Sequence, residues 1–295
     1  MEMTLLGTGC PVVSTDRYGP ATLVQQGDVT ALIDCGSGVT QRLLEAGVTG
    51  ADIDILLLTH LHSDHLVDLY QFVISSWHQG RQKPQRIIGP RGTRKYVDGL
   101  MDLWRREREQ RIAHEMRQST KAFDIEVEEI EDGWTKTIGD LEISAIEVEH
   151  QPVPIAFGFV FQANGRKLVV SGDTRPCDAI RDAALDADLL VHEVFIHAPR
   201  RTGQDTRTPE GIQSVASYHT LDDEVGKLAH DAHVGALVLT HIVPPHADSE
   251  ALFKKVRADF KGPLIVGEDL MRFDIDRLQV RYQRLVLGFD AIGRE

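Results

Sequence analysis

Cysteine is scarce in this sequence, and the three cysteines that it contains, Cys10, Cys35 and Cys177, lie far apart. An odd number at such spacings provides neither a disulfide framework nor a Cys-x-x-Cys metal clamp. We therefore expect each cysteine to be a small buried residue.

Long hydrophobic runs are also missing, since no apolar stretch approaches the roughly 20 residues that a membrane-spanning helix needs. The chain opens on Met3-Thr4-Leu5-Leu6-Gly7, without the basic and apolar regions of a secretory signal. These absences predict a cytoplasmic protein. The composition, 42% hydrophobic and 26% charged, is typical of a globular chain, and 295 residues allow one large domain or two ordinary ones.

Positive charge is scarce overall, because the formal net charge is −13, and this disfavours a general nucleic-acid binder. The exception is the segment 81–121, which contains 12 Lys and Arg against 5 Asp and Glu, whereas the remainder has 20 against 40. This basic segment is either a solvated charged face or a surface that attracts an anionic substrate.

Histidine is concentrated where the sequence reads His-x-His-x-Asp-His, directly after the apolar run 53–58. A strand over that run, ending at Thr59, would deliver these side chains to a sheet edge, where a loop can bend them around one point. Imidazoles suit zinc and similar metals, and a carboxylate adds a harder, negative ligand. Four such side chains predict two metal ions at one loop: His60, His62, Asp64 and His65. The alternative is a surface loop that is rich in histidine by chance.

A glycine-rich turn, Asp34-Cys35-Gly36-Ser37-Gly38, follows the strand expected at residues 29–33. It lacks the spacing of a Walker or dinucleotide motif, so a tight turn is favoured over a phosphate cradle. Asp34 is a candidate partner of a metal ligand.

The remaining pattern is that of an α/β chain. Strands are expected at residues 3–6, 21–25, 86–90, 123–128, 141–149, 154–161, 167–170, 234–239, 264–266 and 270–275. Helices are expected at 41–46, from His65 to about Trp77, at 93–108, and after Thr220, which matches a capping box with Asp223. Residues 198–208 are polar and predict a loop.

Polar residues recur where the expected strands end. His150, Ser171-Gly172-Asp173, His192-Glu193 and Thr240-His241 all take such positions. Open sheets with helical layers place their sites at strand ends, so we expect these side chains to contribute to one site.

Taken together, these motifs resemble the metallo-β-lactamase superfamily of binuclear metallohydrolases. The resemblance covers nearly the whole chain and is closest to the ribonuclease Z branch, which includes phosphodiesterases and arylsulfatase-like hydrolases. The further motifs that carry it are Leu6-Gly7-Thr8-Gly9, Asp34-Cys35-Gly36, Gly89-Pro90-Arg91-Gly92, Thr174-Arg175 after Asp173, and His219-Thr220. It implies a four-layer αββα sandwich, formed by residues 1–295 as a single domain.

The resemblance also implies the ligands and the catalytic residues. One ion would be held by His60, His62 and His150, and the other by Asp64, His65 and His241, with Asp173 bridging them. The implied catalytic residues are His219, Glu193 and Asp64. Zinc is favoured by the ligand types, and iron or manganese is also compatible with them.

In this arrangement, two ions about 3.5–4 Å apart lower the pKa of a bridging water, which makes hydroxide available. His219 would donate a proton to the leaving oxygen or stabilise charge in the transition state, and Glu193 would orient the ring. The alternative for His219 is a residue that merely precedes a helix cap. For His192, a buried ring satisfied by the backbone is as well supported as a functional role.

One departure from the branch concerns the substrate. Ribonucleases Z of one large class carry a long arm between the third histidine ligand and the bridging aspartate, whereas His150 and Asp173 are only 23 positions apart here. The expected function is therefore hydrolysis of phosphodiester or similar anionic ester bonds without a tRNA-clamping arm. Alternatives are a tRNA 3′-processing endoribonuclease, an arylsulfatase, or a non-catalytic binding protein on the same fold. Expected partners are a small anionic ester or RNA, with no membrane, and a homodimer is compatible with the sequence.

Overall fold

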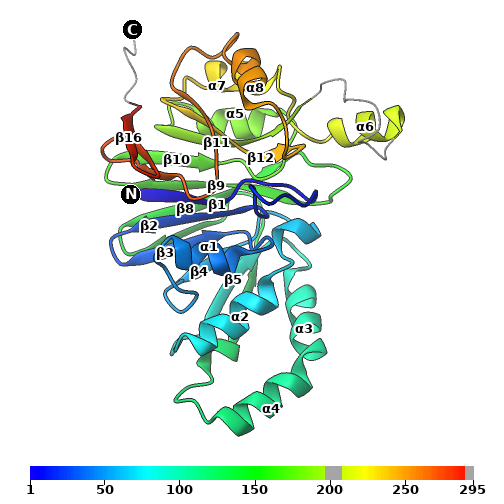
Figure 1. Cartoon of the computed structure of the whole chain (residues 1–295), viewed down its shortest axis with the longest axis vertical. Helices are drawn as coiled ribbons and strands as arrows, with labels where there is room; N and C mark the ends of the chain where they lie inside the picture. Colours follow the sequence, from blue (N-terminus) through cyan, green and yellow to red (C-terminus); the bar gives the residue numbers. More distant parts are fainter. Residues whose placement is uncertain (197–207, 290–295) are drawn as a thin grey trace.

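Two β-sheets packed face to face, with helices on both outer faces, form the body of the molecule (Figure 1). The structure is a computed structural model that describes residues 1–196 and 208–289. This four-layer α/β arrangement is the predicted αββα sandwich.

The first sheet has nine strands among the described residues, and both ends of the described chain contribute to it. Its central strands β3 to β6 are parallel, and its other strands pair antiparallel. In spatial order the strands are β16 (Leu285–Gly288), β15 (Gln279–Tyr282), β14 (Arg272–Asp274), β1 (Glu2–Gly7), β2 (Ala21–Gln26), β3 (Val29–Ile33), β4 (Ile55–Leu57), β5 (Gln85–Gly89) and β6 (Ile125–Glu129).

The second sheet has seven strands among the described residues. Strands β10 to β13 are parallel, and β7 to β10 pair antiparallel. In spatial order the strands are β13 (Leu264–Val266), β12 (Leu237–Val243), β11 (Leu189–Phe195), β10 (Arg166–Val170), β9 (Ala156–Ala163), β8 (Leu141–Val148) and β7 (Thr135–Ile138).

Helices cover the outer face of each sheet because alternate strand residues point to opposite faces. On β9, Phe157, Phe159 and Phe161 enter the core between the sheets, whereas Val160 packs toward the helices of the second sheet. The helices are α1 (Val39–Glu45), α2 (Leu69–His78), α3 (Thr93–Leu103) and α4 (Arg105–Glu115) beside the first sheet, and α5 (Asp178–Ala184), α6 (Pro209–Ala216), α7 (Val225–Asp231) and α8 (Ser249–Val256) in the other half (Figure 1). Two short 3-10 turns are η1 (Ser63–His65) and η2 (Lys121–Phe123).

Two predicted helices differ from those observed. The helix expected at residues 93–108 breaks at Trp104 into α3 and α4, and α4 buries no residue, since its sequence offers no apolar face. The capping box at Thr220 is wrong, because its hydroxyl donates to the carbonyl of Thr174 and α7 begins only at Val225.

Cys10 and Cys35 are buried as predicted, whereas Cys177 is only partly buried. The predicted loop 198–208 lies outside the described residues except for Thr208.

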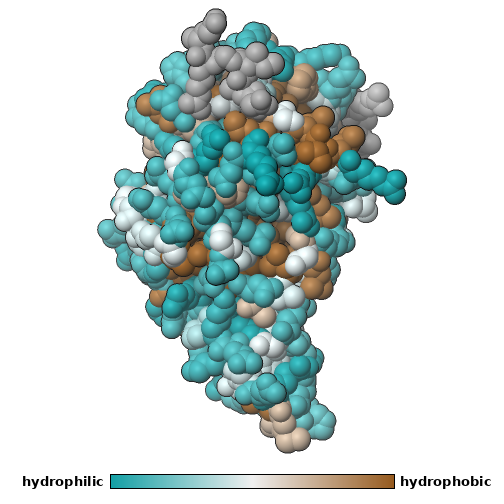
Figure 2. All heavy atoms as spheres, turned by 90° about the vertical axis from the view of Figure 1, so that its left-hand side faces the viewer, coloured by the Kyte–Doolittle hydropathy of each residue, from teal (hydrophilic) through white to brown (hydrophobic). Residues whose placement is uncertain are grey.

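The surface agrees with the charged composition. Figure 2 views the side that carries β16 and shows a mainly hydrophilic surface with hydrophobic groups in its upper and middle parts. Leu285, Val286 and Leu287 of β16 are exposed at the edge of the first sheet. Within residues 1–196 and 208–289, no helix combines the length and the apolar character needed to cross a membrane.

Candidate metal centre

The His-x-His-x-Asp-His loop leaves the first sheet after β4 and faces the second sheet. Its start is fixed by Asp34, whose carboxylate accepts the backbone N–H of Thr59 at 2.9 Å and the Thr59 hydroxyl at 2.9 Å. Its end is fixed by the amide of Cys35, which donates to the carbonyl of His65 at 2.6 Å. The turn after β3, which contains Asp34 and Cys35, therefore holds both ends of the loop by hydrogen bonds.

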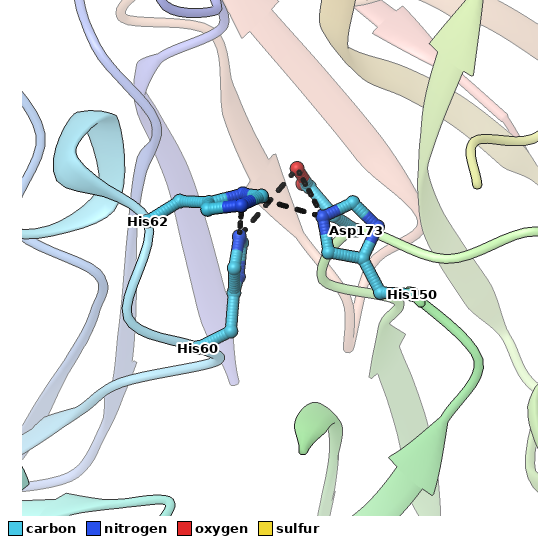
Figure 3. Close-up of side chains that lie close together, drawn as sticks. All are labelled: His60, His62, His150 and Asp173. Carbon is cyan, nitrogen blue, oxygen red and sulfur yellow. Dashed lines mark hydrogen bonds and ion pairs between the residues drawn. The ribbon is translucent and has the colours of Figure 1, made fainter. Parts of the chain in front are cut away.

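One group of metal-binding side chains combines the loop with two strand ends of the second sheet. His60 Nε2 lies 3.0 Å from His62 Nδ1, and His150 Nε2 lies 3.4 Å from the same His62 atom. Both His60 and His150 place Nε2 3.8 Å from Asp173 Oδ2. Figure 3 shows the three rings and the carboxylate converging on one point.

A second group lies on the other side of Asp173. His241 Nε2 is 3.3 Å from Asp64 Oδ2, and His65 Nε2 is 3.5 Å from the same oxygen. Both rings also lie 3.4 Å from Asp173 Oδ2. A single carboxylate oxygen thus borders both groups, and all seven predicted ligand residues meet at one centre.

The protonation states of His60, His62, His150 and Asp173 suit metal binding. Burial lowers the pKa of His60 and of His62, and it lowers the pKa of His150 to about 4. These rings are therefore neutral near pH 7, which is the form that binds metals. Burial alone would raise the pKa of Asp173, but the surrounding imidazoles hold it well below its usual range, so this residue is a carboxylate.

Hydrogen bonds from outside the centre turn three rings so that Nε2 points inward. Nδ1 of His60 lies 3.0 Å from the Thr59 hydroxyl, Nδ1 of His65 lies 2.7 Å from Asp34 Oδ2, and Nδ1 of His150 lies 2.9 Å from the Tyr218 carbonyl. Such support fixes the tautomer of a metal-binding histidine.

Unpartnered atoms give an independent test of whether a metal fits. His65 Nε2 and His241 Nδ1 are buried and make no hydrogen bond to any described residue. A buried polar atom without a partner is costly, and a metal ion would satisfy His65 Nε2 between the two carboxylates. The imidazole and carboxylate donors fit a divalent transition metal, so these residues could bind one.

The predicted pair Glu193 and His219 lies beside the second group. His219 Nδ1 is 2.8 Å from Glu193 Oε1, which also accepts the Thr174 amide at 2.9 Å. The His219 ring stacks on His241, with 5.7 Å between centroids. Burial by itself would lower the pKa of His219, but the Glu193 carboxylate outweighs burial and raises it to about 9.

His192 is not part of this cluster. Its Nδ1 donates to the carbonyl of Glu193 at 2.8 Å, and burial lowers its pKa to about 4. Because it alternates with Glu193 on β11, its side chain leaves the opposite face of the strand. The bond of Nδ1 agrees with the alternative of a buried histidine held by the backbone, whereas the buried Nε2 has no hydrogen-bond partner among the described residues.

Comparisons with known proteins place this geometry in a family. A family model described as Anti-Pycsar protein Apyc1 matches residues 1–208. A ribonuclease Z of Mycobacterium bovis is 37% identical over 281 residues, covering 93% of this chain and 98% of that relative. The metallo-β-lactamase fold protein YhfI of Bacillus subtilis has a TM-score of 0.72 at 20% identity, covering 92% of this chain and 99% of that chain. The chain belongs to the ribonuclease Z-like metallo-β-lactamase family, in the group that the Apyc1 model describes.

A further solved structure supports the same fold. The short form of human tRNase Z has a TM-score of 0.68 at 22% identity and covers 93% of this chain and 99% of that chain. The predicted fold and family are thus confirmed, and the chain is a metal-dependent hydrolase of the ribonuclease Z type. The prediction of an enzyme is confirmed with it, which disfavours a non-catalytic binding protein.

Gly36 and Gly172 of this ribonuclease Z-like chain lie where the backbone of another segment approaches closely. The Gly36 amide donates to the Pro20 carbonyl, and a Cβ on Gly36 would lie 2.5 Å from the backbone of Gly19. Gly172 has φ +61, and a Cβ there would lie 2.4 Å from the Phe157 carbonyl. The tight-turn interpretation of residues 34–38 is confirmed, and Gly172 is what lets Asp173 follow β10 so closely.

Two supporting groups were not identified in the sequence. The Thr59 hydroxyl contacts Asp34 and His60, and the strand-Thr-His pattern was the only signal for it. The Tyr218 carbonyl is backbone, so residue type gives no signal.

The basic segment 81–121 is less available to a substrate than its composition indicates. Nine of its twelve cations bond to nearby carboxylates or carbonyls within the described structure, and buried Arg81 bonds to five carbonyls. Within the segment 81–121, the cations with neither an ion pair nor a hydrogen bond to a described residue are Arg91, Lys95 and Arg106. Most of the positive charges in this segment are therefore paired with groups of the protein itself, which agrees with the interpretation of a solvated charged face.

Proposed function

We propose that this protein hydrolyses phosphodiester bonds with two divalent metal ions, and that zinc is the favoured metal, with iron or manganese as alternatives. The observation that carries the proposal is Asp173 Oδ2, which borders two separate groups of donors at 3.4–3.8 Å. One carboxylate between two donor groups is the arrangement expected of a two-metal hydrolase.

In this proposal each ion has its own histidines. His60, His62 and His150 would hold one ion, and Asp64, His65 and His241 would hold the other. Asp173 would contribute to both sites. Asp64 and Asp173 contribute two negative charges against the four positive charges of two divalent ions, so the donor set with its ions is net positive. That charge suits an anionic ester.

The ions would supply an activated water nucleophile and compensate the charge of a phosphoryl group. In the hydrolysis, the oxygen of a water molecule would bond to phosphorus and its proton would pass to solvent, while the bond from phosphorus to the leaving oxygen breaks. His219 holds a proton that the leaving oxygen accepts, since Glu193 and the pKa of about 9 favour its charged form. Glu193 fixes the ring through Nδ1, which leaves Nε2 to carry that proton.

A second candidate is cleavage of precursor tRNA, because the Mycobacterium bovis relative is named ribonuclease Z. Strands β9 and β10 fill the interval between His150 and Asp173, so it contains no long arm. That relative aligns over 98% of its own length with 93% of this chain, so it has little room for such an arm either. The missing arm therefore does not separate the two candidates.

A comparison of three substrates tests the proposal. The purified protein, supplied with zinc, would be assayed with bis(4-nitrophenyl) phosphate, 4-nitrophenyl sulfate and a precursor tRNA. We expect hydrolysis of the phosphodiester and little of the sulfate, and loss of both metal and activity in Asp173→Asn. The matched control is Asp28→Asn, an exposed aspartate in the turn between β2 and β3. Cleavage of the tRNA alone would favour the second candidate, and hydrolysis of none of the three by the metal-loaded protein would contradict the proposal.

A further inference from the structure

His241 is held differently from its neighbours. The rings of His60, His65, His150 and His219 each have Nδ1 bonded to a group outside the cluster, whereas Nδ1 of His241 is buried without a partner. No hydrogen bond from outside the cluster therefore orients this ring, and its own backbone has a larger part in placing it.

That backbone is irregular. In the pairing of β11 with β12, Glu193 is opposite Thr240 and Val194 is opposite Ile242, so His241 is skipped. Its φ is +40, a left-handed conformation that a residue with a side chain rarely adopts. Such a conformation persists only where neighbouring groups determine it.

Two loops hold the chain on either side of His241. The amide of Ile242 donates to the carbonyl of Thr8 at 3.0 Å, and the amide of Gly267 donates to the carbonyl of Leu239 at 2.8 Å. Thr8 follows β1, and Gly267 follows β13, so these bonds come from both sheets.

One buried carboxylate joins the two loops. Asp269 Oδ1 accepts the Thr8 amide at 2.9 Å and the Thr8 hydroxyl at 2.8 Å, and Oδ2 accepts the Tyr18 amide at 2.8 Å. Arg17 completes the link, since it donates to the Thr8 hydroxyl at 2.6 Å and to the Gly267 carbonyl at 2.5 Å. Asp269 is 6% exposed, so solvent cannot replace these bonds readily.

We propose that Asp269 is a positioning residue that fixes His241 through Thr8 and so determines how tightly the second of the two ions is bound. The proposal rests on the two-ion assignment made above. It concerns one ion only, because His60 and His150 are held by Thr59 and the Tyr218 carbonyl, which do not contact Asp269.

The experiment measures metal binding by Asp269→Asn and Thr8→Val. Each metal-free protein would be titrated with zinc against a chromophoric chelator, and circular dichroism would check that it is folded. The matched control is Asp274→Asn, since Asp274 is also a buried carboxylate of the same terminal segment but bonds to Arg277. Thr8→Val keeps every backbone bond and removes only the hydroxyl, so it provides a test if Asp269→Asn does not fold.

We expect two tight ions in the unsubstituted protein and in the control. In Asp269→Asn the dissociation constant of one ion should rise about 10- to 100-fold while the other stays unchanged, and Thr8→Val should show a smaller rise for the same ion. Wild-type affinity for both ions in both variants would overturn the inference and leave the proposed function intact. Equal weakening of both ions would also overturn it, since that indicates a general structural role. Fewer than two ions in the unsubstituted protein would overturn the two-ion assignment, and this inference with it.

Discussion

His219 is the residue whose replacement separates proton transfer from metal binding. Its ring contacts Glu193 and stacks on His241, but our proposed ligand sets do not include it. We predict that His219→Ala lowers kcat by about 10²-fold or more, because the leaving oxygen loses its proton donor. Steady-state kinetics on an aryl phosphodiester, with elemental analysis of the same sample, would measure this.

The control for that prediction is His230→Ala, an exposed histidine of α7. It should retain full turnover. If His219→Ala also retained full turnover with its metal content intact, His219 would have no part in the reaction.

Gly172 precedes the proposed metal ligand Asp173, and its backbone conformation and close surroundings favour glycine at this position. Gly165 and Gly172 flank β10, and both have positive φ, +72 and +61, but only Gly172 is crowded by the Phe157 carbonyl. We predict that Gly165→Ala costs about 1 kcal/mol, from the left-handed conformation alone. Gly172→Ala should cost about 3 kcal/mol or more, since a backbone carbonyl must also move. Urea unfolding of the two variants would measure the difference, and equal costs would contradict the argument from crowding.

Residue types and their spacing predicted the site correctly where the side chains themselves carry the metal-binding chemistry. The loop at residues 60–65 could be identified as a metal site because imidazole and carboxylate side chains have few other reasons to cluster. Asp269 could not be recognised, since an isolated aspartate after a short strand has no distinctive pattern. Its importance follows from the structure, in which the loops that contain Thr8 and Gly267 meet at Asp269.

At the scale of elements, Arg81 joins three segments of the first half of the chain. Its guanidinium donates to the carbonyls of Gly50, Ala51, Ile53, Lys83 and Pro84, at 2.6–3.3 Å, and the residue is 2% exposed. Burial lowers its pKa to about 10, so it remains charged at neutral pH. The end of α2, the loop before β4 and the start of β5 are thus fixed by one side chain.

We predict that Arg81→Met destabilises the protein by about 3 kcal/mol or more, because several buried carbonyls lose their donors. Chemical denaturation followed by circular dichroism would measure it. Arg86→Met is the matched control, since Arg86 is 54% exposed and pairs only with the exposed Glu126, and it should change stability by less than about 1 kcal/mol. Similar effects of both substitutions would contradict the assigned role of Arg81.

Elements with a clear apolar pattern were predictable, and those without one were not. Strands β2, β3 and β10 fall where expected, since alternation and β-branched residues indicate them. Strands β7, β15 and β16 were missed because each has only four residues, and Val280 of β15 is the one buried residue among them. The helix predicted at 93–108 was expected to be continuous, whereas the chain breaks at Trp104 and a second helix continues to Glu115, because the basic end shares no apolar face with the start.

At the scale of the whole molecule, the centre exists only where the two sheets meet. The loop at residues 60–65 comes from the first sheet, and His150, Asp173 and His241 follow or belong to strands of the second. The sequence alone indicated polar strand ends but not which ends converge, because strand order depends on long-range pairing. The resemblance to a known family supplied that information. A single domain over residues 1–295, a cytoplasmic location and a homodimer remain predictions.

The two-ion centre also predicts how the molecule responds to metal removal. Without metal, imidazoles and carboxylates remain crowded around unpartnered atoms such as His65 Nε2. Ions that bind only the folded chain stabilise it by mass action, by about 3 kcal/mol at a hundredfold excess over the dissociation constant. We therefore expect chelation to lower the melting temperature and zinc to restore it. An unchanged melting temperature on complete removal of tightly bound metal would contradict this coupling.

The central claim is that one carboxylate, Asp173, joins two metal sites. Elemental analysis of protein purified without chelator and without added metal tests it most directly. We predict about two divalent ions per chain, and a clear decrease in Asp173→Asn but not in Asp28→Asn. About one ion per chain or fewer in the unsubstituted protein would contradict the claim.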